Sequence, residues 1–237
     1  MNRPAPWSLL LFGFALAVSS PAVSGQTAVS SPAQSAARIV FTFEHPQLQP
    51  ARYTITFDPS GAGHFTSEPG PAPADSEDGI YPAPLDRPIE IDGSLRDALF
   101  RYARGHAFFN FHCSTDRSGL AFVGNKTLSY AGPDGNGSCS FVWAADPVLQ
   151  HLADQLGAVA FTLEEGRRLD IEVHHDRLGL DAELEALQDA VREQHAWDLP
   201  NIASELRAIA EDQQVMDRAR KRALALLARS ESSGKPN

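Results

Sequence analysis

The sequence lacks the motifs by which most enzymes and nucleotide-binding proteins are recognised. It contains no G-x-S-x-G elbow, no H-E-x-x-H helix, no Walker loop and no glycine-rich dinucleotide fingerprint. The spacings His-x-His and His-x-x-x-His, which place two imidazoles on one metal ion, are also absent. We therefore predict no catalytic residue, no cofactor and no metal site.

Basic residues and long apolar runs are scarce as well. The chain has 20 Lys and Arg against 30 Asp and Glu, a net charge of −10. A surface of this charge repels phosphate backbones and anionic lipid, so we expect no nucleic-acid partner. No later stretch approaches the roughly 18 to 20 apolar residues that a membrane-spanning helix needs. We expect a soluble mature protein without an integral membrane segment.

The first 25 residues have the pattern of a secretory signal peptide. Arg3 precedes an apolar run from Leu9 to Val18, and small residues follow around Val23 and Gly25. The run is too short to cross a bilayer, so we predict cleavage after Gly25 and a secreted or periplasmic location. Cleavage would remove one basic residue and change the net charge to −11.

Alternating apolar and polar residues predict strands in the first half of the mature chain. Residues 38–45 and 52–57 carry their aromatic and β-branched side chains on one face. Residues 64–68 form a short strand and residues 89–92 an edge strand. Between them, the proline and glycine content of residues 69–88 excludes a regular ladder.

The hydrophobic period changes to a helical one at residues 93–105, with Ser94 as cap and Gly105 as the end. Strands are then expected at residues 106–113, 126–130 and 139–143.

The strongest helix signal follows. Asp146 and Pro147 occupy the N-cap and N1 positions, apolar residues recur at three and four as far as Leu163, and Gly166 is the predicted stop. Residues 169–173 form a strand or an extended link. Two or three helices are predicted for the rest of the chain, over residues 180–194, 200–210 and 213–229.

This order of elements predicts an α+β fold. We expect an antiparallel sheet of about five to seven strands, one helix inserted between strands, and a helical C-terminal third that packs on the sheet. The predicted divisions are a signal peptide at 1–25, a flexible lead-in at 26–37, a core at 38–166, a C-terminal helical region at 167–229 and a disordered tail at 230–237.

The loop between the strands 126–130 and 139–143 invites a calcium hypothesis. Asp134, Asn136 and Ser138 stand at positions 1, 3 and 5 of an EF-hand loop, but positions 6 and 12 hold Cys139 and Ala145 instead of glycine and an acid. The proline, glycine and asparagine content favours a hairpin turn.

Cys113 and Cys139 are the only cysteines. Because the chain is expected to be exported and has two cysteines, we predict a disulfide between them. A nucleophilic cysteine would need a histidine beside it, and on a strand the neighbouring His112 would point to the opposite face. In the second strand of the hairpin, Phe141 and Trp143 should share a face with Cys139.

Three charged clusters have solvated or structural interpretations. Residues 174–176, "HHD", would need His151 or His195 as a third metal ligand, and we expect a solvated link there. Residues 75–79, "DSEDG", read as a solvated loop. The basic run at residues 218–222 spreads around a helix with Ala219 turned inward.

Several stretches are similar to uncharacterised exported bacterial proteins: "ITFDPSGAGHF", "HAFFNFHC", "GNKTLSYAGPDGNGSCSFVW" and the tail "IASELRAIAEDQQVMDRARKRALALLA". This resemblance covers roughly residues 38–228. It implies export and assigns no activity.

We expect an exported, non-enzymatic binding or structural domain. One alternative is a secreted hydrolase built from loop residues, with His112, His174 and Asp176 as first candidates. Another is an inhibitor or partner-binding module that presents residues 69–88 or a strand edge to another exported protein.

Overall fold

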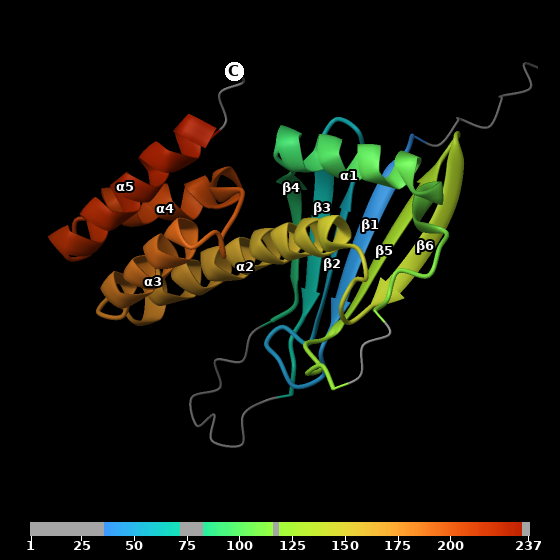
Figure 1. Cartoon of the computed structure of the whole chain (residues 1–237). Helices are drawn as coiled ribbons and strands as arrows, with labels where there is room; N and C mark the ends of the chain where they lie inside the picture. The colour runs from blue at the N-terminus through green and yellow to red at the C-terminus, as the bar shows by residue number, and fades with distance from the viewer. Residues whose placement is uncertain (1–35, 72–82, 116–118, 234–237) are drawn as a thin grey trace, which may run out of the picture. The chain divides into compact units, whose positions relative to one another are not determined.

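A computed structural model describes residues 36–71, 83–115 and 119–233 of the chain. Their centre is a six-stranded antiparallel sheet in the order β4-β3-β2-β1-β5-β6 (Figure 1). The strands are β1 (Arg38–Glu44), β2 (Arg52–Phe57), β3 (Ala62–Glu68), β4 (Leu85–Glu90), β5 (Asn125–Gly132) and β6 (Gly135–Phe141). The structure confirms the predicted α+β class and the antiparallel sheet.

One face of the sheet carries the core. In β1, Ile39, Phe41 and Phe43 are buried and alternate with partly exposed residues. On the other face, Thr42 lies opposite Thr54 of β2 and Thr127 of β5, so this face is rich in hydroxyl groups. The alternation of apolar and polar residues in the sequence reflects this difference between the two faces.

Helix α1 (Gly93–Gly105) lies between β4 and β5 in the sequence and packs on the core face (Figure 1). Its cap differs from the prediction. The Asp92 carboxylate accepts the backbone N–H groups of Ser94 at 2.8 Å and Leu95 at 3.3 Å, so Asp92 and not Ser94 is the N-cap. Gly105 is the last helical residue, as predicted.

Helix α2 (Pro147–His175) also crosses the core face (Figure 1). Asp146 is the predicted N-cap, and its carboxylate accepts the N–H of Val148 at 2.8 Å. The predicted stop at Gly166 is wrong, because the helix continues and Leu169 is buried within it. A Cβ at Gly166 would lie 2.4 Å from Ile202 Cγ2, so this glycine permits close packing instead of ending the helix.

The remaining helices form a second apolar cluster with Leu169. They are α3 (Leu180–Arg192), the 3₁₀ turn η2 (Leu199–Ile202), α4 (Ala203–Glu211) and α5 (Asp217–Ser233). The edge strand β4 is tied to this cluster through Arg87, which donates to Glu205 and to the Asn201 carbonyl, both at 2.7 Å. Helix α2 thus contributes to both apolar clusters.

The predicted strand at residues 106–113 is wrong. Residues Ala107–Phe109 form the 3₁₀ turn η1, and all three have positive φ angles, of 48°, 56° and 67°. The turn buries Phe109 completely and brings Phe108 against β6, where a Cβ at Gly135 would lie 2.2 Å from the Phe108 ring. Tertiary burial has overridden the strand propensity of this aromatic segment.

The predicted break over residues 69–88 is wrong in its last part. Strand β4 begins at Leu85 and pairs with β3, where Pro88 lies opposite His64. Proline is accommodated because β4 is an edge strand. The acidic cluster 75–79 and the predicted leader 1–25 lie outside the described residues.

Candidate binding groove

A groove of about 730 Å³ lies between one end of the sheet and α2. The strands supply Phe43, Tyr53 and Lys126. Helix α2 and the segment after α3 supply the other wall: His151, Ala153, Asp154, Gln155, Gly157 and Ala158, with Gln194, His195 and Trp197.

Strand register gathers the three sheet residues. Phe43 of β1 lies opposite Tyr53 of β2 and opposite Lys126 of β5, so the three form one row across adjacent strands on the core face. The rings of Phe43 and Tyr53 are stacked, with centroids 5.0 Å apart and planes at 20°. This stacking gives the groove a rigid aromatic floor.

Lys126 is the unusual member of this row, since its side chain points into the core face and is only 9% exposed. Its ammonium donates to the Val142 carbonyl at 3.1 Å and lies 5.7 Å from the centre of the Trp143 ring. Burial lowers the pKa of Lys126, and the nearby charge of Asp154 partly offsets this effect. The groove therefore contains a desolvated cation.

Tyr53 places a second polar group in the groove. Its ring is buried, and a Cβ at Gly157 would lie 3.7 Å from its hydroxyl oxygen. Burial, reinforced by Asp154, raises the pKa of Tyr53, so the hydroxyl keeps its proton at neutral pH. The hydroxyl has no hydrogen-bond partner among the described residues.

The acids at this end of the sheet are engaged in other contacts. Asp154 accepts from Gln150 Nε2 at 2.8 Å. A smaller hollow of about 230 Å³ shares Phe43, Tyr53 and Gly157 with the groove and adds Glu164 and Glu165. Glu164 accepts from Ser67 and Arg167, and Glu165 lies 3.3 Å from Arg168.

The segment after α3 is held against α2 by one buried threonine. Thr162 Oγ1 accepts the backbone N–H of Trp197 at 2.9 Å and donates to the Ala158 carbonyl at 3.0 Å. Left-handed backbone at Gln194 and Asp198, with φ of 63° and 58°, brackets this segment. Both turns position Trp197 at the groove wall.

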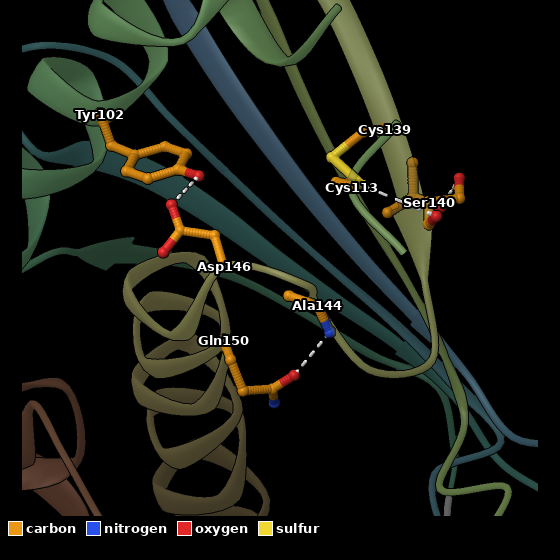
Figure 2. The surroundings of a disulfide bond; sticks show 8 residues. Tyr102, Cys113, Cys139, Ser140, Ala144, Asp146 and Gln150 are labelled. Atoms are coloured by element: carbon orange, nitrogen blue, oxygen red, sulfur yellow. Dashed lines mark hydrogen bonds between the residues drawn. A yellow bond between two sulfur atoms is a disulfide. The ribbon is translucent and has the colours of Figure 1, made fainter. Parts of the chain in front are cut away.

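The two cysteines lie beside the start of α2 (Figure 2). Their sulfur atoms are at disulfide distance, 2.36 Å, with Cα atoms 6.0 Å apart, as the predicted pairing requires. Cys113 is not in a strand, but its carbonyl accepts the Ala145 N–H at 2.8 Å. The pair fastens the segment after η1 to β6 next to the Asp146 cap.

The hairpin β5–β6 is confirmed, and its turn has a structural role. Asp134 accepts from Arg104 Nε at 2.8 Å and from the Tyr130 hydroxyl. The predicted face is correct for Cys139 and Phe141, which are buried. It is wrong for Trp143, because β6 ends at Phe141 and the Trp143 indole N–H turns to the Ala121 carbonyl at 2.9 Å.

The candidate hydrolase residues are not brought together. His174 lies in the last turn of α2, and Asp176 is the C-cap. Residues 169–173, predicted as a strand or an extended link, are therefore helical. His112 precedes Cys113, which contacts the residue before the Asp146 cap. The length of α2 separates these positions by about 40 Å. Among the described residues, no group of three His, Cys, Asp or Glu side chains is arranged to hold a metal ion.

The basic run of α5 is paired with acids. Arg222 lies 3.0 Å from Asp181 and Lys221 lies 2.7 Å from Asp217, while Ala219 is fully buried as predicted. The contacts support a structural role for this run.

The chain matches no protein-family model, and no curated protein is similar enough in sequence to match it. No helix in the described part of the chain is long and apolar enough to cross a membrane.

Only two of the groove residues, His151 and His195, were considered as functional residues in the sequence analysis, and there as possible metal ligands. A signal for Lys126 was present: it alternates with Leu128 and Tyr130, both buried, so the strand period places this lysine on the core face.

Proposed function

We propose that this chain is an exported, non-enzymatic domain that binds a small ligand in the groove between the sheet and α2. The observation that carries the proposal is the desolvated Lys126 ammonium in a groove of about 730 Å³ with an aromatic floor. Hollows of this size that combine aromatic side chains with a few convergent polar groups are typical of ligand sites.

Export is supported by the leader pattern of residues 1–25 and by a cysteine pair at disulfide distance. The absence of a catalytic motif in the sequence, and the separation of His112 from His174, favour binding over hydrolysis.

The test uses a pair of glycine variants. Gly157 lies in both hollows, and Gly157→Leu would place a branched side chain beside the Tyr53 hydroxyl. Gly105→Leu is the matched control, since a Cβ at Gly105 would meet nothing within 4 Å.

Isothermal titration calorimetry with 4-phenylbutyrate, 4-phenylbutyramide and 4-phenylbutylamine provides the readout. We expect at least one probe to bind the wild type and Gly105→Leu equally and to bind Gly157→Leu roughly tenfold more weakly. The proposal fails if no probe binds, or if Gly157→Leu binds like the wild type. A steady hydrolytic activity lost on changing one polar residue would contradict its non-enzymatic part.

A further inference from the structure

The groove lining holds one lysine ammonium, that of Lys126, and one carboxylate, that of Asp154. The carboxylates of Asp154 and Glu164 already accept hydrogen bonds, and Glu165 is paired with Arg168. The ammonium of Lys126 has three N–H groups, and a single hydrogen bond, to Val142, accounts for one of them among the described residues.

The surroundings of Lys126 strengthen its attraction for an anion. Its side chain lies between Phe43 and Phe141 of the adjacent strands, with Trp143 near the ammonium. Water is largely excluded from this position, so an ionic hydrogen bond formed there is stronger than one formed at the surface. Asp154 is exposed, and its negative charge opposes the lowering of the Lys126 pKa by burial.

An apolar path leads away from the ammonium. Phe43 stands between Lys126 and Tyr53 in the same row, and two strand spacings cover roughly 10 Å. The far end of this path is the Tyr53 ring beneath Gly157. A ligand that follows it has one anionic end and an apolar body of a few carbon–carbon bonds or one ring.

We propose that the groove binds small organic carboxylates, with the carboxylate on Lys126 and the apolar body over Phe43 toward Tyr53. This inference rests on the proposed function, because it names the ligand class of the same groove. It does not follow from the net charge of −10, which repels anions at long range, so the selectivity must come from the local contact.

The test compares 4-phenylbutyrate with its neutral amide and its amine on the wild type and three variants. Calorimetry gives the dissociation constants, and the Trp143 indole resonance reports on the Lys126 end of the groove. For the wild type, we expect the acid to bind roughly tenfold more tightly than the amide. Lys126→Met should bind acid and amide equally, whereas Lys126→Arg should keep the preference for the acid.

Lys221→Met is the matched control, since Lys221 is exposed on α5 and should leave all three affinities unchanged. Far-UV circular dichroism checks that each variant is folded. Equal binding of acid and amide to the wild type, preference for the amine, or an acid preference that survives in Lys126→Met would each overturn the carboxylate assignment. If one of these results occurs while Gly157→Leu still weakens binding, the proposed function stands; if no probe binds, both proposals fail.

Discussion

At the residue scale, Asp198 is a half-buried acid whose neighbours are also acids. It begins the turn η2 in left-handed conformation, and its carboxylate accepts the Asp92 N–H at 3.0 Å. Burial raises the pKa of Asp198 from 3.8 to about 7, and repulsion from Asp92 and Glu90 adds to the rise. The folded protein therefore holds a proton on Asp198 that the unfolded chain releases.

This difference predicts that Asp198→Asn becomes more stable relative to the wild type as the pH rises. Between pH 4 and pH 7 the folded state binds more protons than the unfolded state, so the wild type loses stability as the pH rises through this window. Asparagine accepts the same hydrogen bond and tolerates the left-handed backbone. From pH 4 to pH 8, the stability of the variant relative to wild type should increase by roughly 1–3 kcal/mol, discounted for partial exposure.

Urea unfolding at pH 4, 6 and 8 measures this increase. Asp97→Asn is the control, because Asp97 is exposed and its hydrogen bond with Arg96 lowers its pKa. A difference between Asp198→Asn and wild type that stays constant with pH would show that Asp198 titrates normally in the folded state.

At the scale of elements, α2 carries two glycines with opposite roles. A Cβ at Gly166 would lie 2.4 Å from Ile202 Cγ2 and 3.0 Å from Ile202 Cβ, where η2 presses on the helix. A Cβ at Gly157 would meet only the Tyr53 hydroxyl, at 3.7 Å. Alanine favours a helix over glycine by roughly 1 kcal/mol at either position, so their difference reports packing alone.

We expect Gly166→Ala to lower the free energy of unfolding by roughly 1–3 kcal/mol, because η2 must move away. Gly157→Ala should be neutral or should raise it by about 0.5–1 kcal/mol. Chemical denaturation of both variants under one condition makes the comparison. Equal effects of the two substitutions would mean that the contact with Ile202 yields without cost.

These glycines also show what sequence reasoning reaches at this scale. Asp146 and Pro147 predicted the start of α2 correctly, because a cap is a local interaction. Gly166 resembles a stop in any local pattern, and only the approach of Ile202, far along the chain, explains its place inside a helix. The wrong prediction of a strand at residues 106–113 has a similar cause, because the burial of Phe109 depends on contacts with α1 and β6 that a local pattern does not show.

At the scale of the whole molecule, the alternation of residue types predicted the sheet, and the order of elements predicted the α+β class. The groove could not be predicted in this way. Its lining runs from Phe43 to Trp197 and includes three strands, α2 and the segment after α3. Strand register and the path of α2 bring these residues together, and neither can be predicted from a local sequence pattern.

The disulfide bears both on the stability of the fold and on the argument for export. It joins residues separated by 26 positions, and the chain-entropy model assigns such a loop roughly 3.5 kcal/mol. The double variant Cys113→Ala with Cys139→Ala should lose stability of this order in urea unfolding. Thiol titration of the unfolded, unreduced wild type should find no free thiol; two reactive thiols would contradict both the bond and the argument for export drawn from it.

The central claim is that the groove between the sheet and α2 binds ligand, and a ¹H–¹⁵N titration with 4-phenylbutyrate tests it most directly. We predict concentration-dependent shifts at the Lys126 and Gly157 amides and at the Trp197 indole, with little change along α5. Absence of shifts at saturating probe, or shifts confined to surfaces away from these three residues, would contradict the claim.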